Sequence, residues 1–306
     1  MNEENKESKI IIIVGPTASG KSNLAVTIAK KINGEIISAD SRQVYRGMNL
    51  GTGKITKKEM GGIPHHLIDI VNPWNTFSVS RYKKMGRKTI EEIIKRNKTP
   101  IICGGTGHYI EALVEGLIIP EVKPDKKLRK SLENKTAKEL FVLLKKKDPE
   151  RASTIDAYNP RRLIRAIEIA THLGRVPKKQ YNPLPYKTVW IGILKDEDIL
   201  KKRIHARLLS RIKMGMIKEI ENLHDGKKGK PVSWKKLDDF GLEYRYVSRY
   251  IRKLITKEEM IVQLEKEIVN YSKRQNTWFK RNKAIHWIRS IEELYEVQNL
   301  KRKNQN

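Results

Sequence analysis

Short apolar runs alternate along the chain with longer stretches in which apolar residues recur at helical spacing. Six runs predict β-strands, at residues 10–14, 35–38, 66–70, 100–103, 188–194 and 284–288. Helical spacing follows the first, third and fourth runs and predicts helices over residues 21–32, 78–96 and 107–113. Strands that alternate with helices form a parallel sheet with helices on both faces. The pattern therefore predicts an α/β core.

The pattern changes after residue 120. Strand signals vanish between residues 121 and 185, where leucines at helical spacing and a second periodic run at 162–172 predict helices. Long helices then follow the fifth strand, over residues 196–224, 239–254 and 257–280. We therefore predict a core domain made of residues 1–120 and 186–306, into which residues 121–185 are inserted as an all-helical domain.

The loop after the first strand has the residue types of a phosphate-binding loop. It reads Gly15-Pro16-Thr17-Ala18-Ser19-Gly20-Lys21-Ser22. Its glycines let backbone N–H groups point at a phosphate, and the helix that follows presents its positive end to the same anion. Lys21 adds a full positive charge, and the Ser22 hydroxyl can ligate a phosphate-bound Mg²⁺ ion. Because a strand precedes and a helix follows, the segment predicts binding of a di- or triphosphate rather than a chance glycine-rich turn.

The loop after the second strand places a carboxylate near the same site. Asp40 follows the strand at 35–38, and the carboxyl ends of parallel strands share one sheet edge. There Asp40 would hold a metal or handle a proton, or it would simply cap a helical turn. Ser41, Arg42 and Gln43 offer donors and acceptors suited to reading the edge of a base.

The charge balance points to a polyanionic partner. The chain has 64 Lys and Arg residues against 35 Asp and Glu, a formal net charge of +29. A generally lysine-rich composition is the alternative explanation, but the basic residues are clustered. Residues 123–147 hold ten basic residues against three acids, and residues 271–283 hold five basic residues, three aromatics and no acid. Cations interleaved with aromatic rings suit RNA phosphates with unstacked bases between them, so nucleic acid is the predicted partner.

Composition excludes several other classes. No apolar run approaches the roughly 20 residues that a membrane-spanning helix needs. The single cysteine, Cys103, rules out a disulfide framework and a cysteine-based zinc site. Residues 1–9 are polar and mixed in charge, unlike a signal or transit peptide. We therefore expect a cytoplasmic protein that works as a monomer and has no membrane partner.

Five motifs occur in an order typical of one enzyme family. They are the phosphate loop, Asp40-Ser41-Arg42-Gln43-Val44-Tyr45, Pro64-His65-His66-Leu67-Ile68-Asp69, Gly104-Gly105-Thr106-Gly107 and Lys273-Arg274-Gln275-Asn276-Thr277-Trp278-Phe279. Together they resemble the tRNA dimethylallyltransferases, also called tRNA isopentenyltransferases, from about residue 10 to residue 288. The chain departs from the family at Arg42, where methionine is more usual, and at Gly241-Leu242-Glu243, which replaces a glycine-tyrosine segment. The zinc module of eukaryotic relatives is absent, so the resemblance is to the bacterial type.

The resemblance implies a particular reaction. The dimethylallyl group of dimethylallyl diphosphate would pass to the exocyclic amine of adenosine 37 of tRNA, just 3′ of the anticodon, in tRNAs that read codons beginning with U. The product would be N6-isopentenyladenosine. The phosphate loop would hold the diphosphate, with Mg²⁺ at Ser22 and with Arg207 as the family's diphosphate-binding arginine. Thr17 would hydrogen-bond the departing oxygen, and Asp40 would orient the amine and accept its proton.

The resemblance also implies a surface for the anticodon stem-loop. The inserted domain would contribute Arg129, Arg161, Arg162, Leu163, Ile164 and Arg165. Of these, Leu163 and Ile164 are expected to pack and the arginines to meet phosphates. The core would contribute Asp40, Ser41, Arg42, Gln43, Thr106, Asp238, Asp239, Phe240, Gly241, Leu242, Glu243, Lys273, Arg274, Gln275, Asn276, Thr277, Trp278, Phe279 and Lys280.

A kinase of a nucleotide or other small molecule is the alternative function, because it shares the phosphate loop and the sheet. Two features count against it. The strand at 100–103 ends in glycines, where many kinases place a carboxylate that holds magnesium. A kinase also leaves the basic and aromatic segment 271–283 unexplained. A non-catalytic RNA-binding module, the third possibility, gives no role to Lys21, Ser22 or Asp40.

Overall fold

The computed structural model describes residues 9–227 and 229–293, and the chain forms two compact units. The larger unit combines Met1–Glu115 with Pro183–Asn306, and the smaller is Gly116–Asn182. Each unit has a hydrophobic core of its own. The insertion predicted at residues 121–185 overlaps the smaller unit.

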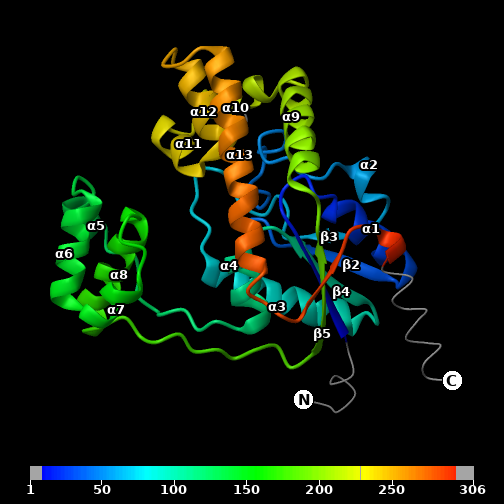
Figure 1. Ribbon diagram of the computed structural model, residues 1–306, viewed down its shortest axis with the longest axis horizontal. Helices are drawn as coiled ribbons and strands as arrows, with labels where there is room; N and C mark the ends of the chain where they lie inside the picture. The colour runs from blue at the N-terminus through cyan, green and yellow to red at the C-terminus, as the bar shows by residue number, and fades with distance from the viewer. Residues whose placement is uncertain (1–8, 228, 294–306) are drawn as a thin grey trace. The chain divides into compact units, whose positions relative to one another are not determined.

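The larger unit is built on a parallel sheet whose six strands lie in the order β3-β2-β4-β1-β5-β6 (Figure 1). They are β1 (Lys9–Val14), β2 (Gly34–Ser38), β3 (His65–His66), β4 (Thr99–Gly104), β5 (Lys187–Ile193) and β6 (Ile285–Ile288). The predicted fold class is confirmed. The predicted strand 66–70 is wrong beyond His66, because Leu67 and Asp69 adopt φ angles of 60° and 54° and turn the chain out of the sheet.

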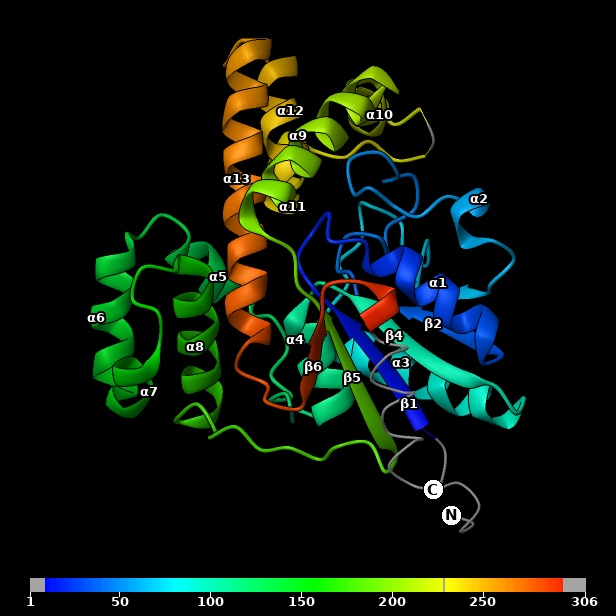
Figure 2. The same ribbon diagram turned by 45° about the vertical axis from the view of Figure 1, so that its right-hand side comes forward.

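Helices cover both faces of this sheet because its strands are apolar on both sides. Ile12 belongs to the same cluster as Ile90 of α3 (Val79–Lys95), whereas Ile13 belongs to a second cluster with Ile28 of α1 (Lys21–Lys31). Consecutive strand residues point to opposite faces, so α1 and α3 pack on opposite sides (Figure 2). Both helices confirm the predictions for residues 21–32 and 78–96.

Shorter helices surround these elements. A capping box between Thr56 and Glu59 begins α2 (Lys57–Met60), which the pattern did not predict. The helix predicted at 107–113 is present as α4 (Gly107–Ile110), which continues as a π-helix over Glu111–Glu115.

In the described part of the chain, five helices lie between β5 and β6 in the same unit. They are α9 (Glu197–Lys213), α10 (Met216–His224), α11 (Trp234–Phe240), α12 (Leu242–Ile251) and α13 (Lys257–Phe279). The prediction of single helices at 196–224 and 239–254 is wrong, since the chain breaks at Gly215 and Gly241, which have φ angles of 98° and 77°. The long helix α13 packs against α9 and α12 (Figure 1).

The secondary-structure elements named for the smaller unit are all helices. It contains α5 (Lys126–Leu132), α6 (Ala137–Lys147), α7 (Pro149–Thr154) and α8 (Pro160–Leu173). Leu140 and Leu144 of α6 pack with Leu163 and Ile167 of α8. The leucine spacing that predicted helices in this region is explained by this core.

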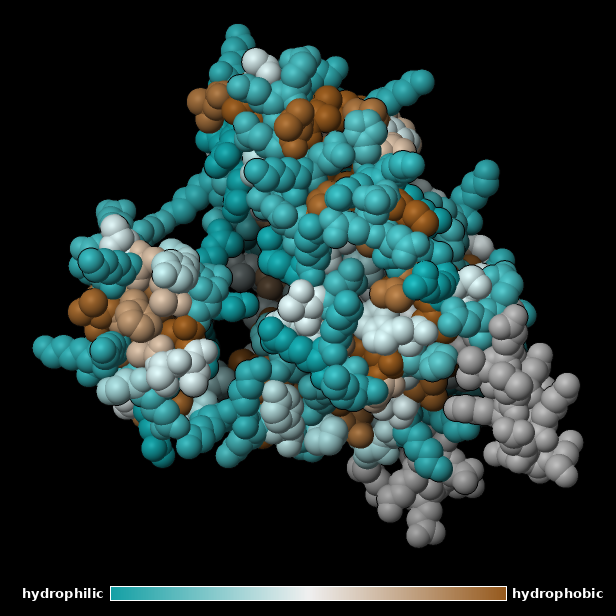
Figure 3. Space-filling view, in the orientation of Figure 1, coloured by the Kyte–Doolittle hydropathy of each residue, from teal (hydrophilic) through white to brown (hydrophobic). Residues whose placement is uncertain are grey.

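On the face shown in Figure 3 hydrophilic residues predominate, and the apolar residues form scattered patches. In residues 9–227 and 229–293 every helix is too short or too polar to cross a membrane.

A buried ion cluster stabilises the end of the sheet where β2 begins. The Glu35 side chain is 4% exposed and accepts hydrogen bonds from His66 Nε2 at 2.6 Å and Arg96 Nη2 at 2.7 Å, with Lys98 Nζ at 3.0 Å from the other oxygen. Burial alone would raise the pKa of Glu35, but the bonds from Arg96, Lys98 and His66 outweigh it and lower the pKa to about 2.

Replacing Glu35 with glutamine is expected to lower the free energy of unfolding at pH 7 by about 2 kcal/mol, the scale of hydrogen bonds to a charged group. The carboxylate stabilises the fold fully above its unfolded pKa of 4.5, and this contribution is lost as the pH falls through about 2. Urea unfolding of wild type and Glu35→Gln between pH 7 and pH 2 should therefore show a difference that shrinks in acid. Glu92→Gln, which removes a surface pair with Lys88 at 3.7 Å, should change little at any pH. A pH-independent difference for Glu35→Gln would contradict this account.

Candidate active site

The phosphate loop joins β1 to α1 at the carboxyl edge of the sheet. Gly15 and Gly20 have φ angles of 153° and 96°, and Ala18 is also left-handed at 60°. A Cβ atom at Gly15 would stand 3.0 Å from Ser19 Oγ and 3.3 Å from the Ile193 carbonyl oxygen. The loop therefore needs glycine there, and it closes tightly enough to present its backbone amides to an anion.

Two cations and a carboxylate gather beside this loop. Lys21 Nζ donates to the Pro16 carbonyl at 3.1 Å, and Arg207 Nη2 of α9 donates to the Gly53 carbonyl at 2.9 Å. Burial lowers the pKa of both groups, and the nearby Asp40 charge partly opposes the shift in each. Two desolvated cations that are close enough to repel one another are stabilised when an anion binds to both. This arrangement suits a diphosphate.

Asp40 uses one of its carboxylate oxygens as a cap. Its Oδ1 accepts hydrogen bonds from the backbone N–H groups of Arg42 at 2.8 Å and Gln43 at 3.3 Å. In the described part of the chain, Oδ2 has no hydrogen-bond partner. The capping and the proton-handling interpretations of this residue are therefore compatible, since they use different oxygens.

Thr106 ties the Asp40 loop to the end of β4. Its backbone N–H donates to the Ala39 carbonyl at 3.1 Å, and its Oγ1 accepts from Ser41 N–H at 3.1 Å. A Cβ atom at Gly104 would lie 2.2 Å from the Ala39 oxygen. The glycines of this motif thus allow two loops to touch, and the contact holds Asp40 in place.

Gln275 of α13 bridges the phosphate loop and the β4 loop. It is 6% exposed, and its Oε1 accepts from Thr17 N–H at 2.8 Å while its Nε2 donates to the Gly105 carbonyl at 2.9 Å. The resemblance placed this residue in the RNA surface. In the structure both ends of its amide are occupied within the site.

Two residues beside the site were not among the sequence candidates. Tyr271 of α13 shares a hydrogen bond with Thr106, and burial, followed by the Asp40 charge, raises its pKa to about 12. Arg203 lies one helical turn before Arg207 on α9 and approaches Gly20. The four-residue spacing of Arg203 and Arg207 was the signal that could have identified the second arginine.

The predicted RNA residues around α11 are largely occupied by contacts within the protein. Arg42 Nε donates to the carbonyl of buried Phe240 at 2.8 Å, and both carboxylate oxygens of Asp238 accept from Nη2 of Arg252, at 3.1 and 2.9 Å. Further along, Glu243 is buried against Arg211 at 2.7 Å. The structure leaves Asp239 exposed and Gln43, Gly241 and Leu242 half-buried.

The remaining residues of segment 273–280, which were predicted to contact RNA, differ in exposure: some are buried or half-buried and others are exposed. Trp278 packs over Gly107, where a Cβ atom would come within 2.2 Å of the indole ring. Phe279 is buried and Asn276 is half-buried. The exposed members, whose side chains are accessible to a large ligand, are Lys273, Arg274 and Thr277, together with Lys280 directly after the helix.

In the smaller unit, Arg129 and Arg165, two of the arginines predicted to bind RNA, are paired with a buried carboxylate. Glu168 is fully buried and accepts hydrogen bonds from Nε and Nη2 of Arg129, each at 2.8 Å. It also forms an ion pair with Arg165. Leu163 is fully buried as well, so its part in any RNA surface is to hold α8 in shape. The other predicted residues of α8 are more accessible: Arg161 and Arg162 are exposed, and Ile164 is half-buried.

The fold and the site define a phosphate-loop α/β protein with buried cations beside that loop. The family model described as IPP transferase matches residues 43–282. A relative from Trichlorobacter lovleyi named tRNA dimethylallyltransferase 2 is 40% identical over 286 residues, 91% of each chain. The chain therefore belongs to the IPP transferase family, the tRNA dimethylallyltransferases, and the resemblance of its motifs is confirmed.

Solved structures agree with this assignment. Full-length tRNA isopentenylpyrophosphate transferase from Bacillus halodurans is 36% identical, with a TM-score of 0.70 over 97% of this chain and 96% of that chain. A eukaryotic dimethylallyltransferase acting on tRNA has a TM-score of 0.73 at 27% identity, covering 89% of this chain and 70% of that chain.

Gln275→Ala should separate the bridging role of this residue from an RNA contact. The substitution leaves the N–H of Thr17 and the carbonyl of Gly105 unpaired, so affinity for inorganic diphosphate is expected to fall about tenfold. Affinity for tRNA should change much less. Calorimetric titration measures the first and filter binding the second. Val262→Ala, at an exposed position of the same helix, is the matched control and should alter neither. Weakened RNA binding with normal diphosphate binding would favour a direct RNA contact instead.

Proposed function

We propose that Lys21, Arg207 and Asp40 carry out dimethylallyl transfer to tRNA, the reaction after which the relatives of this chain are named. The observation that carries the proposal is the meeting of two desolvated cations and a carboxylate with one free oxygen at a single sheet edge. The two cations can bind the diphosphate of the prenyl donor. The carboxylate can accept a proton from the amine that attacks this donor.

The leaving group sets the first requirement. As the allylic carbon–oxygen bond breaks, negative charge builds on the diphosphate, and preorganised donors stabilise that charge best in a desolvated site. Lys21, Arg207 and the backbone amides of the phosphate loop would supply them, and the Thr17 hydroxyl would donate to the departing oxygen. The backbone of Thr17 is already fixed by Gln275, which keeps this hydroxyl on the loop.

Mg²⁺ fits the same loop. The Ser22 hydroxyl stands at the start of α1 without a hydrogen-bond partner in the described residues. Mg²⁺ is typically held by one or two protein oxygens together with substrate phosphates. When bound, the ion would neutralise part of the diphosphate charge, with Ser22 as its protein ligand.

The acceptor amine sets the second requirement. The adenine nitrogen forms a bond to the allylic carbon as the carbon–oxygen bond breaks, and the amine must then lose a proton. Asp40 Oδ2 can accept it, since Oδ1 is held by the two backbone N–H groups that fix the loop. The base has to leave its stack to reach this carboxylate, as base-modifying enzymes require.

The tRNA backbone would be held by exposed cations. In the larger unit these are Lys273 and Arg274 on α13 and Lys280 directly after it, beside the half-buried Trp278, whose indole would serve for stacking. In the smaller unit Arg161 and Arg162 begin α8 with exposed side chains. We propose a cytoplasmic monomer, because every group assigned to the reaction lies in one chain.

The end of β4 counts against the kinase alternative. β4 ends at Gly104, and the loop that follows carries Thr106 where a magnesium-binding carboxylate would be expected. Incubation with labelled dimethylallyl diphosphate or labelled ATP, with and without tRNA, tests the proposal. Label should pass from the prenyl donor to an adenosine of the RNA. Robust ATP turnover with no prenyl transfer would overturn the assignment.

Asp40→Asn isolates the charge of this residue from its capping role. Asparagine still accepts both backbone N–H groups, so the loop should keep its conformation. Loss of the general base is expected to lower the single-turnover rate about 100- to 10,000-fold at saturating tRNA and donor. Affinity for tRNA should change far less, because phosphate contacts dominate it. A rate within about threefold of wild type would remove Asp40 from the proton transfer.

A further inference from the structure

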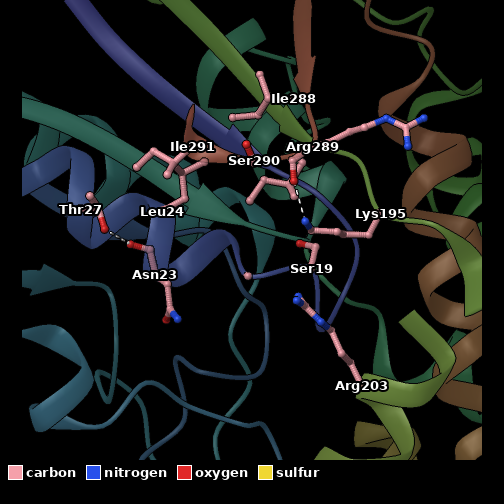
Figure 4. A pocket seen from close by; sticks show the side chains of 12 residues that line it. Ser19, Asn23, Leu24, Thr27, Lys195, Arg203, Ile288, Arg289, Ser290 and Ile291 are labelled. Carbon is pink, nitrogen blue, oxygen red and sulfur yellow. Dashed lines mark hydrogen bonds between the residues drawn. The ribbon is translucent and has the colours of Figure 1, made fainter. Parts of the chain in front are cut away.

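Two cavities in the larger unit have similar volumes but differ in how their polar groups are paired. The first, of about 230 Å³, lies beside the phosphate loop (Figure 4). Its Lys195 Nζ donates to the Arg289 carbonyl, and its Thr27 hydroxyl donates to the Asn23 carbonyl, as the dashed lines in Figure 4 mark. The second, of about 240 Å³, is lined by a residue whose buried side-chain oxygen has no hydrogen-bond partner among the described residues. This second cavity is therefore the stronger candidate for an unassigned ligand.

Three segments that lie far apart in the sequence form the wall of the second cavity. Arg46 comes from the chain after β2, and Asn72 and Trp74 come from the chain after β3. The Arg46 N–H donates to the Val71 carbonyl at 2.8 Å, which ties these two segments together. The volume is below the roughly 300 Å³ at which pockets enclose a whole drug-sized ligand, so the cavity suits one ring system of a larger molecule. The third side comes from the end of α10 and the chain that follows it, including Asn222, Gly229 and Lys230.

Trp74 gives the cavity a flat apolar face. It is half-buried, and a Cβ atom at Gly229 would stand 2.6 Å from the six-membered ring of the indole. The backbone at Gly229 therefore lies directly against one edge of the ring. Pro73 and Leu223, which also line the cavity, are buried. An aromatic face held in this way suits stacking with a planar ligand.

Polar groups of two kinds surround this apolar face. Asn222 Oδ1 is buried and has no hydrogen-bond partner within the described chain, and such an atom needs a donor. Arg46 and Lys230 line the cavity with exposed side chains. Arg46 Nε donates to the Asp69 carbonyl at 2.7 Å, but in residues 9–227 and 229–293 neither cation is paired with a carboxylate. The cavity thus offers one buried acceptor and two exposed cations.

Contacts within the protein connect this cavity to the surface predicted to bind RNA. Lys236 Nζ donates to the Asn75 carbonyl, directly after the cavity wall, at 3.0 Å. The same ammonium lies 5.7 Å from the centroid of the Phe240 ring, and the Phe240 carbonyl accepts from Arg42. Arg42 in turn donates its backbone N–H to the Asp40 carboxylate. The cavity and the proposed transfer site therefore belong to one continuous part of the larger unit.

We propose that this cavity binds a second unpaired base of the RNA substrate, distinct from the acceptor adenine. The base stacks on Trp74, one of its N–H groups donates to Asn222 Oδ1, and its phosphates meet Arg46 and Lys230. Single-stranded RNA is recognised by this combination of stacking on aromatic rings and hydrogen bonds to base edges. The rim cations and the net charge of +29 favour RNA over a free mononucleotide. The inference rests on the proposed function, which brings the RNA to Asp40.

Anticodon stem-loop RNAs, each with one abasic site in the loop, test this subsite by filter binding. In wild-type protein, removal of one base other than the acceptor adenine should lower the affinity about tenfold, the scale of one base stacked on an aromatic ring. Trp74→Ala should weaken binding of the intact stem-loop by a similar factor and should lose the sensitivity to that abasic site. Trp74→Phe, the matched control, keeps an aromatic ring and should retain most of the affinity.

Asn222→Leu tests the hydrogen bond independently of the ring. Leucine leaves the N–H of the base without an acceptor, so RNA affinity should fall about tenfold. The free energy of unfolding should not fall, since the amide oxygen that is removed has no partner in the described chain. Affinity for inorganic diphosphate should be unchanged in all three variants, which shows that the fold is retained.

Wild-type affinity that no abasic site outside the acceptor position alters would overturn the subsite, as would normal RNA binding by Trp74→Ala and Asn222→Leu proteins that still bind diphosphate. Binding of free AMP or GMP that both substitutions abolish, with RNA affinity unchanged, would assign the cavity to a mononucleotide instead. Prenyl transfer to tRNA by the wild-type protein separates the two proposals. Absent transfer with an intact abasic effect would refute the transferase assignment and leave the subsite standing. Normal transfer without that effect would refute only the subsite.

Discussion

Everything at the site depends on the parallel pairing of β1 with β4 on one side and β5 on the other. Val14, the last residue of β1, is in register with Gly104 and with Gly192. Because the three strands run in the same direction and end together, their following loops are delivered to one edge of the sheet. The phosphate loop thereby has the Thr106 loop on one flank and the residues that follow β5 on the other.

Buried carboxylates and buried cations differ in their partners in this protein. Glu35 and Glu168 are each surrounded by cations that neutralise them, so their burial is compatible with a stable fold. Lys21 and Arg207 are desolvated too, but the hydrogen bonds recorded for them go to backbone carbonyls. A neutral oxygen compensates a buried cation less than a carboxylate does. An anion that binds to these two cations would compensate their burial, and a diphosphate has the charge to do so.

Residues with the chemistry to bind RNA are also used to build the protein. Arg129 and Arg165 hold Glu168, Arg42 holds the end of α11, and Gln275 joins the loops around Thr17. Loss of RNA binding after substitution of any of them would report on the fold as well as on a contact. Exposed cations such as Arg162 and Lys280 are cleaner probes of the RNA surface.

Local pattern was enough to determine the strands, the phosphate loop and most helices, because apolar spacing and glycine placement act over a few residues. The same reasoning failed where a single backbone angle decided the outcome. Gly215 and Gly241 break helices that periodicity alone would continue, and Leu67 ends β3 early. The roles proposed for Lys21 and Asp40 also come from the sequence, since their residue types and their positions after strands restrict what they can do.

Only the tertiary structure decides whether a polar side chain is exposed to a ligand or holds other parts of the protein together. Gln275 lies 258 residues from Thr17, and the Thr106 hydroxyl that accepts from Ser41 N–H lies 65 residues further along the chain. Such contacts depend on distances set by the packing of the whole sheet, which no short stretch of sequence contains.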